Sequence, residues 1–563
     1  MATEKLILDF VYEHEAQRAK QVLLTQPIGG GQVRDYTWAQ ALGESRRMAS
    51  HLQGLGFERG ARIAMLSKNS AHFIMAELAI WMAGYTTVAI FPTESAETIA
   101  YVLGHSEASL LFVGKLDTWA QQAGAVPPGL PCIELPLGPG IGSAVGPETW
   151  DAIVARSAPI AGQPARGIDD LAMINYTSGS TGTPKGVMHS FGSVTRGALG
   201  ICQYQEKQLG PDFNYRALSY LPLAHIFERA WLECAGLLRG SGRVFFTESL
   251  DTFMQDLQRA RPTTFLSVPR LWLKFQHGVY AKMPPAKLDR LLDIPIVGKL
   301  VARKVLKGLG LDQVKLAGSG SAPIPAVLID WYRRLGLNLM EGYAMTEDFA
   351  YSHTAVAGKC SPGYVGIPQP GVRVRISGEG EVLIQSPGSM VGYYKQLELN
   401  AESFTADGFF HTGDLGEIAP DGQLKLTGRK KELFKTGKGK YVAPAPIENR
   451  LNECPAIELS MVSGVGQQAA YGLVVLAEEL RPQLASAAVR AEVEATLKQL
   501  LADVNKYLPD YERLRMLVVA KTPWSIENGC LTPTMKIKRS RIEAAVAHEV
   551  DAWFAKPGTV LWA

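Results

Sequence analysis

The sequence predicts an α/β protein with two unequal domains. We expect a large N-terminal domain of mixed sheets packed with helices, which includes a β-rich subdomain, and a small α+β C-terminal domain. At 563 residues the chain is too long for one ordinary core. Helical and strand periods alternate through its first half, which is typical of a parallel sheet covered by helices. Beyond Gly363 short strand-like segments separated by Gly, Pro and Asp replace this alternation.

The predicted elements of the N-terminal domain alternate in type along the chain. The apolar stretch 78–92 is shorter than a bilayer span, so it predicts a buried helix followed by a buried strand. Residues 123–168 are rich in Gly, Pro and Ala and predict a long surface connection. We expect helices at 39–55, 70–83, 96–106, 194–206, 228–238 and 254–260, and strands at 62–66, 87–91, 109–113, 171–176, 216–220, 243–246 and 264–268.

The remaining elements divide into two groups. Short strands between turn residues fill 372–427 and predict the β-rich subdomain. The C-terminal domain is predicted to hold strands 459–465, 470–476 and 513–519 and a helix at 487–506.

Composition limits the function classes. A net charge of +3 disfavours general nucleic-acid binding. Six separated cysteines without a C-x-x-C pair favour reduced thiols, and the acidic N-terminal stretch does not predict a signal peptide, so a cytoplasmic location is expected. No amphipathic basic helix stands out, so we expect at most peripheral membrane contact. The sequence is compatible with a homodimer.

The stretch YTSGSTGTPKG at 176–186 predicts a phosphate-binding loop. Its glycines and small hydroxyl residues leave backbone N–H groups free to surround anionic oxygens, and its lysine adds a charge. The spacing differs from the P-loop motif of kinases and ATPases, and a plain flexible turn is the alternative. The candidate phosphate-binding residues are Thr177, Ser178, Gly179, Ser180, Thr181, Gly182, Thr183 and Lys185.

This loop resembles the signature loop of the adenylate-forming superfamily, which comprises acyl-CoA synthetases, peptide-synthetase adenylation domains and luciferases. Five further motifs follow in the order that this superfamily has, and together they cover most of the chain. They are AGSGSAPI at 317–324, EGYAMTE at 341–347, HTGDLGEI at 411–418, GRKKELFKTGKGKYVAPAPIE at 428–448 and LTPTMKIKR at 531–539.

The resemblance implies a site for ATP and Mg²⁺. Tyr343 would offer its ring to adenine, with Gly320, Ser321, Ala322, Pro323, Glu341 and Gly342 beside it. Glu347 would bind Mg²⁺ and Thr346 the α-phosphate. Each has a structural alternative, since Tyr343 could be a core aromatic and the Thr–Glu pair a helix cap.

Two further residues would hold the nucleotide. The Asp414 carboxylate would accept the ribose hydroxyl groups, and Arg429 would reach the ribose or a phosphate with its planar fork. An ordinary turn aspartate and a solvated surface arginine are the alternatives.

The resemblance also implies two steps joined by a rotation. Domain 1–430 would bind ATP and the acid, and domain 431–563 would supply Lys536, which with Lys185 and Mg²⁺ would neutralise charge as a carboxylate attacks ATP. Lys431 is the predicted hinge, with Glu432 the second choice. Rotation would then bring in Lys435, Lys438 and Lys440 for coenzyme A, although a solvated loop explains these three equally well.

Two segments resemble the long-chain fatty acid–CoA ligase branch, LPLAHIFER at 221–229 and 407–431, although Gly428 stands where many such ligases have Asp. His225 would gate the carboxylate, with a helix-capping histidine as the alternative. Trp231, Phe265, Val268 and Trp272 could line an acyl tunnel or belong to the core. The expected activity is therefore ligation of a medium- or long-chain acid to coenzyme A. Transfer to a carrier-protein thiol and a non-catalytic binding role are the alternatives.

Overall fold

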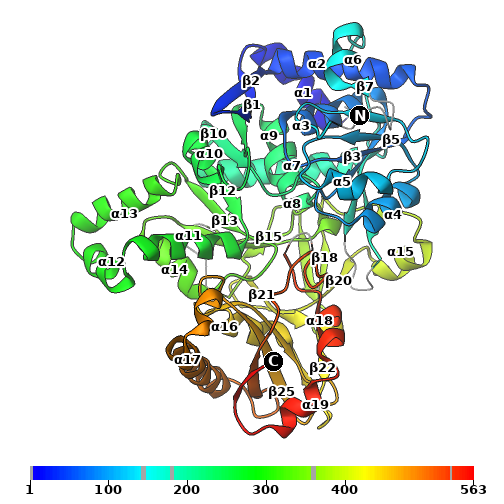
Figure 1. Cartoon of the computed structure of the whole chain (residues 1–563). Helices are drawn as coiled ribbons and strands as arrows, with labels where there is room; N and C mark the ends of the chain where they lie inside the picture. The colour runs from blue at the N-terminus through cyan, green and yellow to red at the C-terminus, as the bar shows by residue number, and fades with distance from the viewer. Residues whose placement is uncertain (1–3, 141–147, 178–182, 357–362, 533–534) are drawn as a thin grey trace.

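The computed structural model describes residues 4–140, 148–177, 183–356, 363–532 and 535–563 (Figure 1). Its largest sheet has eight strands in the order β19-β9-β8-β4-β3-β5-β6-β7. Strands β8, β4, β3, β5, β6 and β7 pair in parallel, whereas β9 is antiparallel to both β8 and β19. These strands are β3 (Arg62–Leu66), β4 (Thr86–Ile90), β5 (Ala108–Val113), β6 (Cys132–Glu134), β7 (Glu148–Thr149), β8 (Leu171–Thr177), β9 (Lys185–Ser190) and β19 (Gly392–Tyr393).

Two more sheets complete the first part of the N-terminal domain. The first has the order β10-β11-β1-β2, and the second has the order β12-β13-β14-β15-β16. Their strands are β1 (Val22–Gly29), β2 (Gln32–Thr37), β10 (Tyr215–Ser219), β11 (Gly242–Phe246), β12 (Thr264–Ser267), β13 (Leu316–Ser319), β14 (Leu339–Tyr343), β15 (His353–Thr354) and β16 (Ile367–Pro368).

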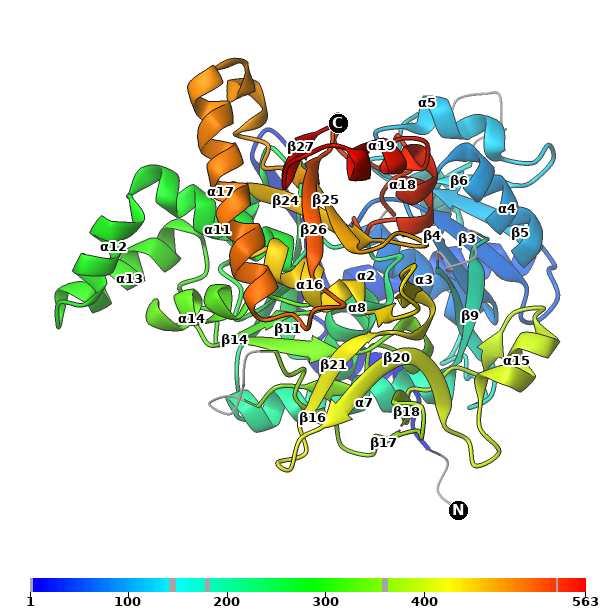
Figure 2. The same ribbon diagram turned by 90° about the horizontal axis from the view of Figure 1, so that it is seen from below.

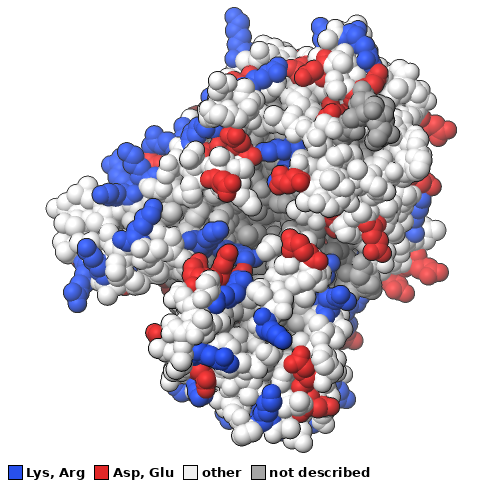
Figure 3. Space-filling view, in the orientation of Figure 1, with Lys and Arg blue, Asp and Glu red and all other residues white. Residues whose placement is uncertain are grey.

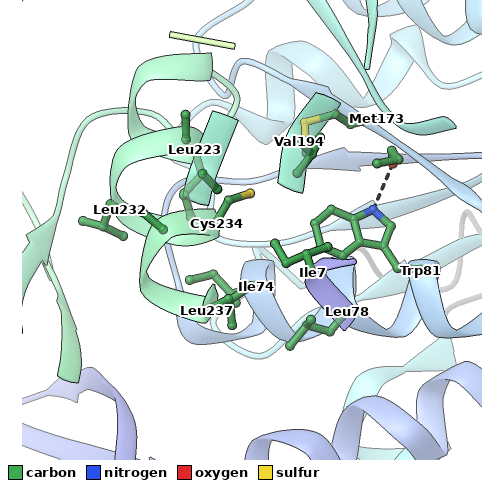
Figure 4. Packing of buried hydrophobic residues seen from close by; sticks show 14 of the residues in the cluster. Ile7, Ile74, Leu78, Trp81, Met173, Val194, Leu223, Leu232, Cys234 and Leu237 are labelled. Atoms are coloured by element: carbon green, nitrogen blue, oxygen red, sulfur yellow. Dashed lines mark hydrogen bonds between the residues drawn. The ribbon is translucent and has the colours of Figure 1, made fainter. Parts of the chain in front are cut away.

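Helices cover these sheets and bury the main core. Helix α3 is buried along its whole length, which confirms the prediction of a buried helix and strand at 78–92. Figure 4 shows the Trp81 ring of α3 packed in this core, where its Nε1–H donates to the Ala172 carbonyl at 2.9 Å. The helices are α1 (Ile7–Arg18), α2 (Trp38–Gly54), α3 (Ala71–Ala83), α4 (Ala96–Ser106), α5 (Trp119–Gln122), α6 (Trp150–Arg156), α7 (Phe191–Leu209), α8 (Ile226–Glu228), α9 (Ala235–Arg239), α10 (Phe253–Ala260), α11 (Pro269–Lys282), α12 (Pro285–Leu292), α13 (Val297–Gly308), α14 (Ala326–Arg334) and α15 (Leu397–Ser403).

The prediction of a surface connection at 123–168 is wrong. Strands β6 and β7 extend the eight-stranded sheet, and α6 follows them. Trp150 at the start of α6 is fully buried and donates through Nε1 to Glu44 at 2.9 Å. This segment therefore contributes to the core, although strands of three and two residues leave no period to read.

The predicted helix 228–238 is present but not uniform. A π-helical turn, Arg229–Cys234, separates α8 from α9. Arg229 in this turn is fully buried and pairs with Glu77 of α3. Such turns are rare in α-helices and occur frequently at functional sites.

The β-rich subdomain and the C-terminal domain follow the predicted order. The former is the antiparallel sheet β17 (Arg373–Ile376), β18 (Glu381–Gln385), β20 (Phe410–Ile418) and β21 (Leu424–Arg429). In the latter, α17 packs on one face of a four-stranded sheet and α18 and α19 on the other (Figure 2). Its elements are β22 (Phe434–Lys435), β23 (Tyr441–Val442), β24 (Ile457–Ser463), β25 (Ala470–Leu476), β26 (Leu514–Val519), β27 (Val560–Trp562), α16 (Pro444–Leu451), α17 (Ala487–Lys506), α18 (Arg539–Val546) and α19 (Val550–Ala555).

Across the described ranges, no helix combines the length and the apolar character that crossing a bilayer would require.

Candidate active site

The glycine-rich loop connects two antiparallel strands of the large sheet. Thr177 at the end of β8 and Lys185 at the start of β9 are cross-strand partners, and Thr183 is exposed between them. Of the predicted phosphate ligands, Ser178, Gly179, Ser180, Thr181 and Gly182 lie outside the described residues. The Lys185 ammonium lies 5.3 Å from the centre of the Tyr393 ring. The hairpin thus fixes the base of the loop and the position of its lysine.

Glu347 lies beside the same tyrosine. It belongs to the 3₁₀ turn Thr346–Asp348 that follows β14, and its Oε1 accepts the Tyr393 hydroxyl at 2.8 Å. The Thr346 carbonyl is held at 2.8 Å by Nε2 of the buried His189. Tyr393 therefore connects the candidate phosphate lysine to the candidate metal ligand, and sequence reasoning did not select it.

Two adjacent carboxyl groups in this turn have different surroundings. Burial raises the pKa of Asp348 to about 8, although the Met345 N–H, which donates to this carboxyl group at 2.9 Å, acts to lower the pKa. Glu347 is only partly buried. A hard oxygen ligand that is open to solvent suits Mg²⁺, which takes one or two carboxylates and completes its shell with phosphate and water. Among the described residues, no three His, Cys, Asp or Glu side chains form a preformed metal cage, and Glu347 fits the more open kind of site.

Asp414 is held between two partners. Its Oδ2 accepts the Tyr343 hydroxyl at 2.6 Å and its Oδ1 accepts Arg429 Nε at 2.6 Å. Asp414 and Arg429 are cross-strand partners in β20 and β21. The negative charge of Asp414 raises the pKa of Arg429, although desolvation acts in the opposite direction. The pKa of Tyr343 is raised mainly by burial and further by Asp414. The predicted adenine and ribose residues therefore form one hydrogen-bonded unit.

The loop after β13 also lies near β14. Gly320 donates its N–H to the Ser267 carbonyl at 3.1 Å, and Ser321 has a positive φ of 68°. Ala322 and Pro323 are exposed. Glu341 is buried beneath this loop and accepts the Ile324 N–H at 3.3 Å. Glu341 therefore contacts the loop itself and supports residues 320–323.

A Cβ atom at Gly342 would lie 3.3 Å from the His353 carbonyl oxygen, which leaves little room for any side chain beside Tyr343. Burial raises the pKa of Glu341 to about 8, and the Ile324 N–H acts in the opposite direction. The carboxyl group that supports the loop is therefore neutral at pH 7.

His225 caps the short helix α8. Its Nδ1 accepts the Phe227 N–H at 3.2 Å, which places the ring proton on Nε2 in the neutral form. Burial, and then the charge of Lys536, lower the pKa of His225 to about 3. The capping role of His225 is thus present, and Nε2 carries the proton of the neutral ring.

Lys536 comes from the C-terminal domain and reaches the cleft. Desolvation and then Arg429 lower its pKa, while Asp414 and Glu347 act in the opposite direction. Lys536 itself is exposed to solvent. Lys536 is therefore within electrostatic range of the candidate ribose carboxylate and the candidate metal ligand, which come from segments far apart in the sequence.

An ionic group outside the cleft joins the two domains in this arrangement. Arg270 at the start of α11 and Arg481 of the C-terminal domain both bind the carboxylate of Glu458. Near the cleft, burial raises the pKa of Glu94, and the charge of Lys538 acts in the opposite direction.

The predicted hinge residue Lys431 is exposed in the 3₁₀ turn after β21.

The three lysines expected to meet coenzyme A after the domains rotate lie together on one hairpin of the C-terminal domain. Lys435, Lys438 and Lys440 are exposed on the β22–β23 hairpin. The described hairpin is tied to its own domain, since Gly437 N–H donates to the Gln467 carbonyl at 2.7 Å. In this arrangement Asp414 therefore acts on the pKa of Lys536, whereas the described residues with the largest effect on that pKa include none of the three hairpin lysines.

The proposed tunnel residues are packed in the structure. Phe265 and Trp272 lie in a core cluster in which their ring centres are 5.3 Å apart. Trp231 is buried and donates through Nε1 to the Ala350 carbonyl at 2.9 Å, and Val268 is partly buried before α11. The three aromatic residues are therefore core residues, as the alternative interpretation stated.

The fold, a large N-terminal domain of mixed sheets and helices followed by a smaller C-terminal domain, is that of the AMP-binding enzymes. The chain belongs to the AMP-binding enzyme family: the family model matches residues 12–394, and the model of the AMP-binding enzyme C-terminal domain matches residues 433–557.

The relatives cover almost the whole chain. The chain is 30% identical to the long-chain-fatty-acid–CoA ligase FadD15 of Mycobacterium bovis, over 97% of this chain and 96% of that protein. It is 28% identical to the long-chain-fatty-acid–CoA ligase 1 of Homo sapiens, over 95% and 85% of the respective chains.

Among solved structures, the adenylation domain of the carboxylic acid reductase from Segniliparus rugosus, in complex with AMP and a co-purified carboxylic acid, has a TM-score of 0.80. It is 23% identical in sequence, and the match covers 98% of this chain and 94% of that one. The anthranilate CoA ligase AuaEII, in complex with anthranoyl-AMP, has a TM-score of 0.76 at 20% identity, with 98% and 99% covered. At these identities the likeness concerns the fold.

The raised pKa of Glu341 predicts a pH dependence of stability. Between the ordinary glutamate pKa of 4.5 and the raised pKa of about 8, the folded protein binds a proton here that the unfolded chain does not, so the free energy of unfolding falls as the pH rises through this window. The Glu341→Gln variant should lack this slope, which is about 1 kcal/mol per pH unit. Urea unfolding across the window measures it, with the exposed Glu402→Gln as the control. Equal slopes for wild type and Glu341→Gln would contradict a neutral Glu341.

Proposed function

We propose that this protein is an acid–thiol ligase that activates a fatty acid with ATP and transfers the acyl group to coenzyme A. The observation that supports the proposal is that Lys536, from the C-terminal domain, lies close enough to Arg429, Asp414 and Glu347 for their charges to shift its pKa. A lysine that only interacts with solvent would have no reason to lie among these charged residues. The names of the relatives, long-chain-fatty-acid–CoA ligases at 28–30% identity over most of the chain, support the substrate class.

The first step places like charges in contact. A carboxylate oxygen attacks the α-phosphorus of ATP, the bond to the pyrophosphate oxygen breaks, and acyl-AMP forms. Lys185 and Lys536 would face the phosphate oxygens and stabilise the negative charge that develops there. Glu347, whose carboxylate Tyr393 fixes, would hold Mg²⁺, and the metal would supply further positive charge against the triphosphate.

The nucleotide would be held by the unit around Asp414. Its carboxylate has further lone pairs for the ribose hydroxyl groups while it accepts from Tyr343 and Arg429. The neutral His225 would place an Nε2–H donor near the acid without adding charge. The loop 320–323, supported by Glu341, would lie beside the adenine.

The second step would require a different arrangement of the domains. The thiolate of coenzyme A attacks the acyl carbon, the bond to the AMP oxygen breaks, and AMP leaves. We propose that rotation about Lys431 removes Lys536 and brings in the hairpin that carries Lys435, Lys438 and Lys440. Coenzyme A is favoured over a carrier-protein thiol because the relatives that cover nearly the whole chain are named CoA ligases.

Separating the two half-reactions tests this proposal. The Lys536→Ala variant should form acyl-AMP and pyrophosphate at least about 100-fold more slowly, because a charged donor at the developing negative charge is lost. Thioester formation from supplied acyl-AMP should stay within about threefold of wild type, since this step would use the other arrangement. Lys521→Ala, an exposed lysine of the same domain, is the control. A wild-type adenylation rate for Lys536→Ala would remove Lys536 from the mechanism.

Tyr393 offers a sharper test of the metal site. Tyr393→Phe keeps the ring beside Lys185 but removes the hydrogen bond to Glu347, which is worth about 1–3 kcal/mol for a charged acceptor. We expect acyl-AMP formation to fall about tenfold and to need more Mg²⁺ for half-maximal rate. The neighbouring Tyr394→Phe is a matched control, because that hydroxyl donates to the exposed Glu107 at 3.3 Å. An unchanged Mg²⁺ requirement in Tyr393→Phe would show that this hydrogen bond does not position the metal ligand.

A further inference from the structure

Helices α12 and α13 extend from the N-terminal domain. Both views place them at the outer edge of the molecule, away from the C-terminal domain's α18 and α19 (Figures 1 and 2). They pack against each other and, through residues such as Leu288 and Ala302, against the core cluster that contains Trp272. Their inner faces are thus anchored, and their outer faces belong to the surface.

Helix α13 has two distinct faces. Val301, Ala302 and Val305 pack inward, whereas the opposite face is exposed and carries Lys299, Leu300, Arg303, Lys304 and Lys307. The helix contains four basic and no acidic residues. The expectation that the chain has no amphipathic basic helix is therefore wrong. The short helix lies inside a long domain, where its pattern is hard to separate from the neighbouring helices.

Apolar side chains are exposed where α12 turns into α13. Ile296 is 75% exposed, Leu300 64%, Ile294 46% and Val297 39%. Ile296 also has a positive φ of 70°, which is rare for a β-branched residue and holds its side chain at the turn. Single exposed apolar residues are ordinary, but four within seven positions form a patch of the kind that marks an interaction site.

Basic charge borders this patch. Residues 284–308 contain six Lys or Arg and two Asp, and both aspartates are paired with Arg334. Within the described part of the chain, Lys299, Arg303, Lys304 and Lys307 form no ion pair, and three of them line a depression of about 350 Å³ with Arg261 and Asp312. Figure 3 shows Lys and Arg side chains along the edge of these projecting helices.

We propose that the α12–α13 surface docks this protein on an anionic lipid membrane. The four apolar side chains would enter the boundary between headgroups and acyl chains, and the four unpaired cations would lie at the level of the lipid phosphates. Charge complementarity selects this partner. A nucleic acid would use the cations but leave the apolar residues in water, and a protein groove would need acidic walls around an apolar floor. The surface uses none of the cleft residues, so the proposal does not depend on the reaction.

Vesicle sedimentation tests the proposal with the full chain. Wild-type protein should bind vesicles of phosphatidylcholine with about one third phosphatidylglycerol, bind pure phosphatidylcholine weakly, and lose binding as salt rises. The variant K299Q/R303Q/K304Q should bind the anionic vesicles at least about tenfold more weakly, since each cation near such a surface is worth roughly fivefold. The control K20Q/K521Q/K556Q removes the same charge from exposed sites elsewhere and should bind as wild type does.

A second variant tests the apolar residues without loss of the fold. I296G/L300S removes the two most exposed side chains, and glycine relieves the positive φ at position 296. It should weaken binding to anionic vesicles while keeping the wild-type melting temperature and salt dependence. Equal loss in the charge control, no binding by wild type, or binding to duplex DNA or an acidic protein but not to vesicles would each overturn the proposal.

Discussion

The position of the Asp414 carboxylate is the constraint on which the candidate site depends. It is fixed from two sides by Tyr343 and Arg429, each at 2.6 Å, and these three residues come from three strands. The contact joins the end of β14 to the β-rich subdomain, and Arg429 is the last residue before the 3₁₀ turn that holds Lys431. The carboxylate thus lies where we propose that a ribose binds, one strand away from the turn that we propose as the hinge.

Charge balance across the domain boundary follows from that arrangement. Lys536 enters a cleft that already holds Arg429, so the approach of one cation to another is unfavourable by itself, and Asp414 and Glu347 offset it. A bound triphosphate would offset it much further, which gives a physical reason why substrate would favour this arrangement of the domains. Loss of pyrophosphate would remove most of that negative charge. The same residues that assist the first step would then favour release of Lys536.

Ordered sequence motifs selected residues that lie near one another in the structure, but they could not reveal contacts that only the folded chain creates. Asp414, Arg429 and Lys536 were selected from their motifs, and the structure brings them together. Tyr393 was not selected because one of two adjacent tyrosines cannot be distinguished without knowing which side of the chain faces Glu347. Strands β6 and β7 were missed because they are too short to show a period; pairing with β5 defines β6, and pairing with β6 defines β7.

The central claim is that this cleft transfers an adenylyl group to a carboxylate. Exchange of labelled pyrophosphate into ATP, measured with Mg²⁺ and straight-chain acids of graded length but without coenzyme A, tests it most directly. Because acyl-AMP formation is reversible on the enzyme, exchange should depend on the acid and rise toward the medium or long chains. Absence of exchange with every acid, from a protein that is folded and binds ATP, would contradict the account.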